Sequence, residues 1–125
     1  MNKTNGQWVI WHKPTCSTSR FVLQTLRDAG VDPVVRDYVQ DPPSQDELRA
    51  ALKAAGIDAR GLLRRKNTPY DELGLGDMGL DDNALIAAMA EHPLLIERPV
   101  VFAPDGRARL CRPKETVSEI LQAAG

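Results

Sequence analysis

The order in which strand-like and helix-like segments follow one another places the strongest constraint on how this chain folds. Residues 8–11, Trp-Val-Ile-Trp, form a short apolar run of β-favouring residues, which predicts a buried strand. An amphipathic helix is predicted next, from the hydroxyl-rich segment 17–19 to Gly30, and a second strand follows around residues 34–39. A strand, a helix and a parallel strand form a right-handed β-α-β unit.

A helical stretch is predicted to follow this unit. Ser44 and Glu47 have the spacing of a capping box, which marks a helix start. The segments with helical apolar spacing are residues 44–55, 59–65, 69–73 and 81–91. We therefore expect a helical insertion over about residues 44–91.

The last third of the chain predicts a hairpin and a helix. Residues 99–102 and 109–111 read as strands on either side of a Pro-Asp-Gly turn. A final helix follows Pro113, and its inward face is expected to hold Val117, Ile120 and Leu121. The complete order, β-α-β, insertion, β-β-α, predicts an α/β, thioredoxin-like fold with a four-stranded mixed sheet.

Length and composition limit the class of protein. The 125 residues, 42% hydrophobic and 26% charged, are typical of a single globular domain over residues 1–125. The net charge of −1 argues against nucleic acid as a partner, and no apolar run approaches the roughly 20 residues that span a bilayer. The polar start, MNKTNGQ, lacks an apolar signal segment, and two cysteines are too few for a disulfide scaffold. We expect a cytoplasmic protein with reduced thiols and, since nothing demands a dimer, a monomer.

Cys16 lies where the first strand should end and the first helix begin. Free N–H groups and a partial positive charge at a helix start stabilise a thiolate, so its pKa should fall below about 8.5. The alternative is a packed structural thiol, but the neighbouring Pro, Thr and Ser residues are not typical of a core segment. His12, four residues earlier, is either a cation that favours the thiolate or a hydrogen-bonded residue at the strand end.

Three other thiol chemistries do not match the spacing. A Cys-x-x-Cys redox pair needs cysteine at position 19, where the chain has Ser19. A tyrosine-phosphatase loop needs arginine six residues after the cysteine, and that residue is Val22. A zinc site needs about four ligands, and Cys16, His12, His92 and Cys111 lack ligand spacing. We therefore expect no metal.

A lone reactive cysteine at a helix start suits an oxyanion substrate or glutathione. Arginine matches the geometry of a tetrahedral oxyanion. The candidates are Arg64, Arg98 and Arg112, because each lies beside apolar residues at the edge of an element. The arginines at positions 27, 36 and 49 are instead expected at the surface. From the residues alone, each candidate is equally consistent with an ordinary salt bridge.

Seven segments together resemble the glutathione/glutaredoxin-dependent arsenate reductase family. They are His12–Arg20 (HKPTCSTSR), Tyr38–Pro43, Leu62–Arg64, Tyr70–Leu75, His92–Pro93, Arg98–Val101 and Leu110–Pro113. The resemblance extends from about Trp8 to Leu121. Each segment alone is weak, but the combination is highly specific.

The resemblance implies a thioredoxin-like fold with a helical insertion and the reduction of arsenate to arsenite. Cys16 matches the nucleophile that forms a covalent thiol–arsenate adduct, with His12 and Ser19 matching residues close to its sulfur. Arg64, Arg98 and Arg112 match arginines that hold arsenate and the adduct, and Pro99 matches a proline that is cis in such folds. Glutathione then attacks the adduct, and glutaredoxin resolves the mixed disulfide. Glutathione is thus a co-substrate, and no tightly bound cofactor is expected.

Two other functions are compatible with the same fold. One is a thiol oxidoreductase that acts on glutathione mixed disulfides. The other is a non-enzymatic regulator that binds RNA polymerase, although that branch commonly uses a Cys-x-x-Cys switch, which Ser19 argues against. Cys111 has no role in the reductase family, and we expect it to be a buried strand thiol.

Overall fold

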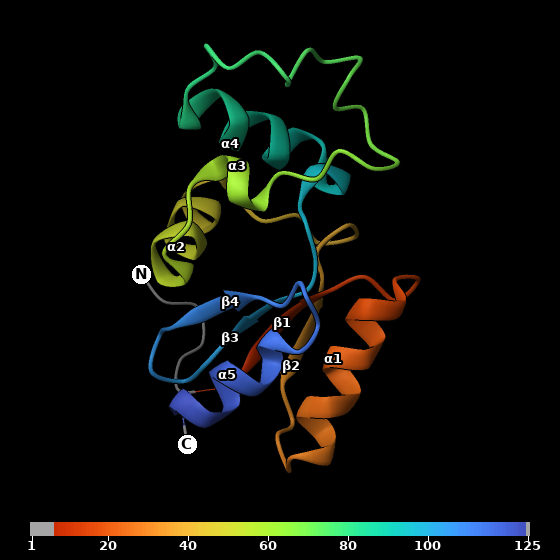
Figure 1. The fold of residues 1–125 in the computed structure, drawn as a ribbon, viewed down its shortest axis with the longest axis vertical. Coiled ribbons are helices and arrows are strands. Elements are labelled where there is room, and N and C mark those ends of the chain that lie inside the picture. The colour runs from red at the N-terminus through yellow and green to blue at the C-terminus, as the bar shows by residue number, and fades with distance from the viewer. Residues whose placement is uncertain (1–6, 125) are drawn as a thin grey trace.

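A mixed β-sheet forms the centre of the protein in the computed structural model, which describes residues 7–124 (Figure 1). Within this range the sheet has four strands in the order β2-β1-β3-β4. The strands are β1 (Val9–His12), β2 (Val34–Asp37), β3 (Val100–Phe102) and β4 (Ala108–Leu110). β1 pairs in parallel with β2 and antiparallel with β3, and β3 pairs antiparallel with β4. The predicted α/β order and mixed sheet are confirmed.

Helices cover both faces of this sheet. One face carries α1 (Ser17–Asp28) and α5 (Thr116–Ala124), and the other carries the insertion, as Figure 1 shows. The insertion contains α2 (Gln45–Ala55), α3 (Ala59–Leu62), α4 (Asp82–Glu91) and a 3-10 turn, η1 (Pro93–Leu95).

Alternation along the strands creates a separate apolar core on each face. Ile10 and Val101 pack with the buried residues of α1 and α5. Their strand neighbours, among them Trp11 and Phe102, pack on the insertion side with α2 and α4. The Trp11 and Phe102 rings lie 4.9 Å apart between centroids. Successive side chains of a strand point to opposite faces, so β1 and β3 contribute to both cores, whereas Val34 and Val35 of β2 are exposed.

The helix ends follow the predicted chemistry. The Ser44 side chain accepts from the Glu47 N–H, and the Glu47 side chain accepts from the Ser44 N–H, which completes the capping box. Gly56 ends α2 with a φ of 68°, a left-handed conformation that glycine adopts without a steric cost. Leu85, Ile86 and Met89 are buried on α4, as expected.

Three predicted elements are shorter in the structure or absent. The helix predicted over residues 59–65 ends at Leu62, because Leu63 is extended and bridges to Ile96. Residues 69–73 form turns instead of a helix, because Gly74, with a φ of 67°, reverses the chain after a single helical hydrogen bond from Leu73 N–H to the Pro69 carbonyl. The second strand ends at Asp37, whose Oδ1 accepts the N–H groups of Val39 and Gln40 and starts a turn. Side chains of Asp and Asn often compete with regular structure in this way.

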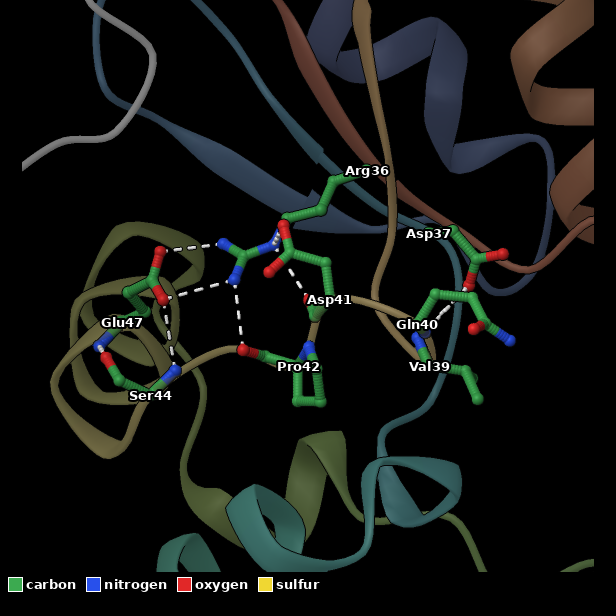
Figure 2. A network of polar contacts seen from close by, with 8 residues as sticks. All are labelled: Arg36, Asp37, Val39, Gln40, Asp41, Pro42, Ser44 and Glu47. Carbon is green, nitrogen blue, oxygen red and sulfur yellow. Dashed lines mark hydrogen bonds and ion pairs between the residues drawn. The ribbon is translucent and has the colours of Figure 1, made fainter.

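Arg36 was expected at the surface, and this prediction is wrong. Its guanidinium makes two hydrogen bonds to the Glu47 carboxylate, 2.7 Å from Nη1 to Oε2 and 3.2 Å from Nη2 to Oε1 (Figure 2). It also donates to the carbonyls of Asp41 and Pro42. The side chains of Arg36 and Glu47 are only 17% and 16% exposed. This network joins β2 to the first helix of the insertion.

Among residues 7–124, no helix is long and apolar enough to cross a membrane. The polar start that lacks a signal segment falls largely on residues 1–6, outside the described range. The division into a single domain stays a prediction.

Replacing Glu47 by alanine removes both the pair with Arg36 and half of the capping box. We expect Glu47→Ala to lower the free energy of unfolding by about 2–3 kcal/mol, since it removes the more buried of two carboxylates that pair with the Arg36 guanidinium, the other being that of the exposed Asp41. Urea unfolding followed by circular dichroism measures this change.

Asp46→Ala is the matched control on the neighbouring residue. Asp46 is 97% exposed and pairs with Arg49 across one helical turn, so its loss should cost less than about 0.5 kcal/mol. Equal destabilisation by the two variants would contradict a structural role for the Arg36 network.

Candidate active site

One edge of the sheet collects the residues that the sequence singles out. The C-terminal ends of the parallel strands β1 and β2 lie at this edge. Because β3 is antiparallel to both β1 and β4, its start and the end of β4 lie there too. Segments that begin at residues 12, 38, 98 and 111 therefore meet, although almost 100 residues separate the first from the last.

Cys16 is the N-cap residue of α1. Its backbone is extended, with φ −93° and ψ 122°, and its N–H donates to the Lys13 carbonyl at 2.9 Å, which turns the chain between strand and helix. The carbonyl of Cys16 accepts the first helical hydrogen bond, from Arg20 N–H at 3.0 Å. The thiol is partly exposed. The expected position, between strand and helix, is confirmed.

The surroundings of Cys16 favour its thiolate. Burial by itself raises the pKa of the thiol. The backbone N–H of Ser19, the Arg98 guanidinium and the backbone N–H of Thr18 lower it by more, so the net pKa falls below its ordinary value. Thr18 and Ser19 belong to the first turn of α1, where N–H groups have no partner within the helix. The sulfur therefore lies where an N-cap oxygen would be, although its side chain makes no capping hydrogen bond in the structure.

Arg98 is a buried cation with unused hydrogen-bonding capacity. It is 8% exposed, and its Nε and Nη1 atoms have no hydrogen-bond partner within residues 7–124. The guanidinium is close enough to Cys16 and Tyr38 to lower the pKa of both groups. A buried charge without a partner is costly, so this position calls for an anion.

Arg112 reaches the same sulfur from the end of β4. Its Nη1 lies 4.0 Å from Cys16 Sγ and donates to the Arg98 carbonyl at 3.1 Å. Arg98 and Arg112 each precede a cis proline, Pro99 and Pro113, and the cis bond at Pro99 agrees with the resemblance. The structure thus places two of the three predicted arginines beside the thiol.

Arg64 enters from the insertion and is held by an acidic residue that the sequence analysis did not select. Leu63 and Ile96 form an antiparallel bridge, which brings Arg64 alongside Glu97. Arg64 Nη1 lies 2.6 Å from Glu97 Oε1, and Arg112 Nε lies 3.7 Å from the same oxygen. In the sequence, Glu97 was marked only as the neighbour of Arg98. The pairing of residues 62–64 with 95–97 is long-range, and no local sequence pattern predicts it.

Tyr38 also belongs to this edge. It is fully buried after the end of β2, and its hydroxyl donates to the Ile96 carbonyl at 3.2 Å. Burial raises the pKa of the phenol to about 12, so it stays neutral at physiological pH. The neutral phenol of Tyr38 therefore lies beside the Arg98 guanidinium. The sequence placed Tyr38 within the second strand, and only the resemblance, through Tyr38–Pro43, linked it to the site.

His12 and Ser19 form a pair next to the thiol. His12 Nδ1 lies 2.6 Å from Ser19 Oγ, which also accepts the Lys13 N–H at 3.1 Å. Burial lowers the pKa of His12 below its ordinary value, which favours the neutral imidazole and the alternative of a hydrogen-bonded residue at the strand end. Ser19 acts on the sulfur through its backbone N–H, while its hydroxyl contacts His12.

Cys111 has the properties of an inert thiol. It is fully buried in the core shared with α1 and α5, and burial raises its pKa to about 12. It lies one residue beyond β4, so its expected burial is confirmed although its place within a strand is not. In the described part of the chain, no three His, Cys, Asp or Glu side chains are grouped as metal ligands.

This fold and site define a class: thioredoxin-like proteins with one accessible cysteine at the start of the first helix, close to buried arginine. The chain belongs to the ArsC family, whose model matches residues 11–120. A structure called arsenate reductase, from Vibrio cholerae, has a TM-score of 0.87 and 47% identity, covering 91% of this chain and 97% of that one.

Two curated proteins extend this comparison. An arsenate reductase of Rhizobium meliloti is 52% identical over 112 residues, which cover 90% of this chain and 79% of that protein. The Escherichia coli protein YfgD, described as uncharacterized, is 46% identical over 113 residues, which cover 90% of this chain and 94% of YfgD.

The two cysteines should differ sharply in reactivity. We expect iodoacetamide to label Cys16 in the folded protein and Cys111 only in denaturant, because alkylation requires an accessible thiolate. Since Arg98 lowers the pKa of Cys16, Arg98→Ala should raise that pKa and slow labelling at neutral pH. Mass spectrometry of labelled peptides across a pH series measures both effects.

Cys111→Ser serves as the control and should leave the Cys16 profile unchanged. Labelling of both thiols at similar rates in the folded protein would contradict the difference in burial. A Cys16 pKa that does not respond to Arg98→Ala would contradict the proposed electrostatic contact.

Proposed function

We propose that this chain reduces arsenate to arsenite, with Cys16 as nucleophile and with Arg64, Arg98 and Arg112 holding the oxyanion. The observation that carries the proposal is the buried guanidinium of Arg98, with two unpartnered nitrogens beside a thiol of lowered pKa. By its close homology to arsenate reductases, the chain is an oxidoreductase of that class.

The first step is attack of the Cys16 thiolate on As(V). A bond forms between sulfur and arsenic, and one oxygen leaves arsenic as water after protonation, which gives a covalent thiol–arsenate adduct. Two anions must approach each other, and this repulsion opposes the step. Arg98 and Arg112 offset it, because fixed cations in a site of low dielectric stabilise the charge that develops as the oxygen leaves.

The second step requires a thiol from outside the chain. Ser19 stands where a resolving cysteine would be, and Cys111 is buried. We assign this role to glutathione, whose sulfur bonds to Cys16 Sγ as the sulfur–arsenic bond breaks. Arsenic gains two electrons and leaves as arsenite, and the two sulfurs are oxidised to a mixed disulfide.

The third step restores the thiolate. A glutaredoxin thiol attacks the glutathione sulfur of the mixed disulfide, and Cys16 leaves as thiolate. The lowered pKa of Cys16 helps here too, since a thiol of low pKa is the better leaving group. No tightly bound cofactor is required. A cytoplasmic, monomeric protein without a nucleic-acid or membrane partner stays the prediction from sequence.

A coupled assay with arsenate, glutathione, glutaredoxin, glutathione reductase and NADPH tests this function. We expect Cys16→Ser to abolish arsenite formation and Arg98→Ala to lower kcat/KM by about a hundredfold or more, since it removes a buried cation from the charged transition state. Arg49→Ala, at an exposed position on α2, should leave the rate unchanged.

Other outcomes discriminate the alternatives. A folded wild-type protein that forms no arsenite would overturn the proposal. Turnover of glutathione mixed disulfides that depends on Cys16 but not on Arg98 would identify the related thiol oxidoreductase. Recovery of RNA polymerase by a protein without thiol activity would identify the regulator.

A further inference from the structure

A single carboxylate oxygen contacts two of the arginines proposed to hold the oxyanion. Glu97 Oε1 lies 2.6 Å from Arg64 Nη1 and 3.7 Å from Arg112 Nε. Arg64 follows α3 in the insertion, whereas Arg112 follows β4 of the sheet. Glu97 therefore connects the two layers of the site through its side chain.

Backbone hydrogen bonds hold Glu97 and Arg64 side by side. Glu97 N–H donates to the Leu62 carbonyl at 2.8 Å, and Arg64 N–H donates to the Leu95 carbonyl at 2.7 Å. The side chains of Arg64 and Glu97 are only 11% and 22% exposed. The carboxylate is thus a fixed part of the site, unlike that of a mobile surface acid.

Each of the two guanidiniums has a further contact, to a backbone carbonyl. Arg64 Nε donates to the Lys66 carbonyl at 3.0 Å, and Arg112 Nη1 donates to the Arg98 carbonyl at 3.1 Å. A planar guanidinium that is held through two of its three nitrogens has a fixed orientation. Glu97 supplies one of the two contacts in both cases, so without it each group could turn about its remaining hydrogen bond.

The third nitrogen of each group stays available. Among the hydrogen bonds and ion pairs within residues 7–124, none uses Nη2 of Arg64 or Arg112. Both groups therefore keep N–H donors for a ligand while Glu97 holds them through other nitrogens. The carboxylate also offsets the repulsion between two cations that lie in one site.

We propose that Glu97 is a positioning residue for oxyanion binding, which holds Arg64 and Arg112 in the orientation in which they bind the anion. This inference rests on the proposed role of these two arginines and adds what orients them. A negative charge in the site would by itself weaken anion binding, because like charges repel. Loss of the positioning contacts has the opposite sign, so removal of the charge distinguishes the two effects.

Protection of Cys16 from iodoacetamide by inorganic phosphate measures this role without turnover. Phosphate is a tetrahedral oxyanion like arsenate, and the reagent is neutral, so phosphate slows labelling by occupying the site. At constant pH and ionic strength, Glu97→Gln should raise the phosphate concentration for half-protection by about tenfold, the usual effect of losing one charge-assisted hydrogen bond.

Two further variants test the charge and its place. Glu97→Asp restores the carboxylate and should need less phosphate for half-protection than Glu97→Gln, whereas repulsion alone predicts the reverse order. Asp71→Asn removes the acid of an exposed pair with Arg65, 71% exposed on both sides, and should keep the wild-type value. Circular dichroism establishes that each variant is folded, and Glu97→Asn replaces Glu97→Gln if the latter is not.

A double-mutant cycle separates positioning from a general structural role. In the Arg64→Ala background the carboxylate has lost one of its two arginines. Glu97→Gln should therefore raise the half-protection concentration by no more than about threefold there, because the two residues act as a unit. A general loss of structure would have the same effect in both backgrounds.

The inference is overturned if Glu97→Gln, or Glu97→Asn in its place, lowers the half-protection concentration or leaves it unchanged, or if the cycle is additive. If phosphate does not protect wild-type Cys16, the oxyanion site itself is refuted, together with this role of Glu97. If phosphate behaves as expected but wild type forms no arsenite from arsenate, only the proposed reaction fails and the role of Glu97 stands.

Discussion

The buried guanidinium of Arg98 is the interaction on which the site depends. Its charge lies beside Cys16 and the neutral phenol of Tyr38, and two of its nitrogens lack a partner in the described chain. A folded protein tolerates such a cation where a nearby anion offsets the cost of desolvation. The thiolate supplies part of that charge, which is also why the thiolate is favoured. Nucleophile and cation thus stabilise each other before any substrate arrives.

The mixed sheet makes this pairing possible. Reversing the direction between β1 and β3 brings the start of β3, with Arg98, beside the end of β1, with Cys16 just beyond. A second reversal returns β4 to the same edge and delivers Arg112. Packing on both faces keeps these short strands in register, and the Arg36–Glu47 network attaches the insertion to β2. Most of the site is therefore a consequence of strand direction.

Local patterns in the sequence were sufficient for most of the fold. Apolar periodicity, the capping box at Ser44 and the turn at Asp105 depend on neighbouring residues, and these predictions are confirmed except for the helix expected at residues 69–73. Cys16 at a helix start was predictable for the same reason. Glu97 and the inward position of Arg36 were not, because each depends on a partner at least eleven residues away. The lowered pKa of His12 follows from burial, which a strand-end position does not reveal.

The insertion contributes Arg64 to the site, whereas Cys16, Arg98 and Arg112 belong to the segments that connect the strands and helices of the sheet. The segments that surround the nucleophile and the arginine proposed to hold the outer side of the oxyanion therefore reside in different layers. Changes in the length or packing of α2–α4 can alter which molecules fit while the thiolate keeps its environment. A scaffold divided in this way can acquire new substrates without rebuilding its chemistry.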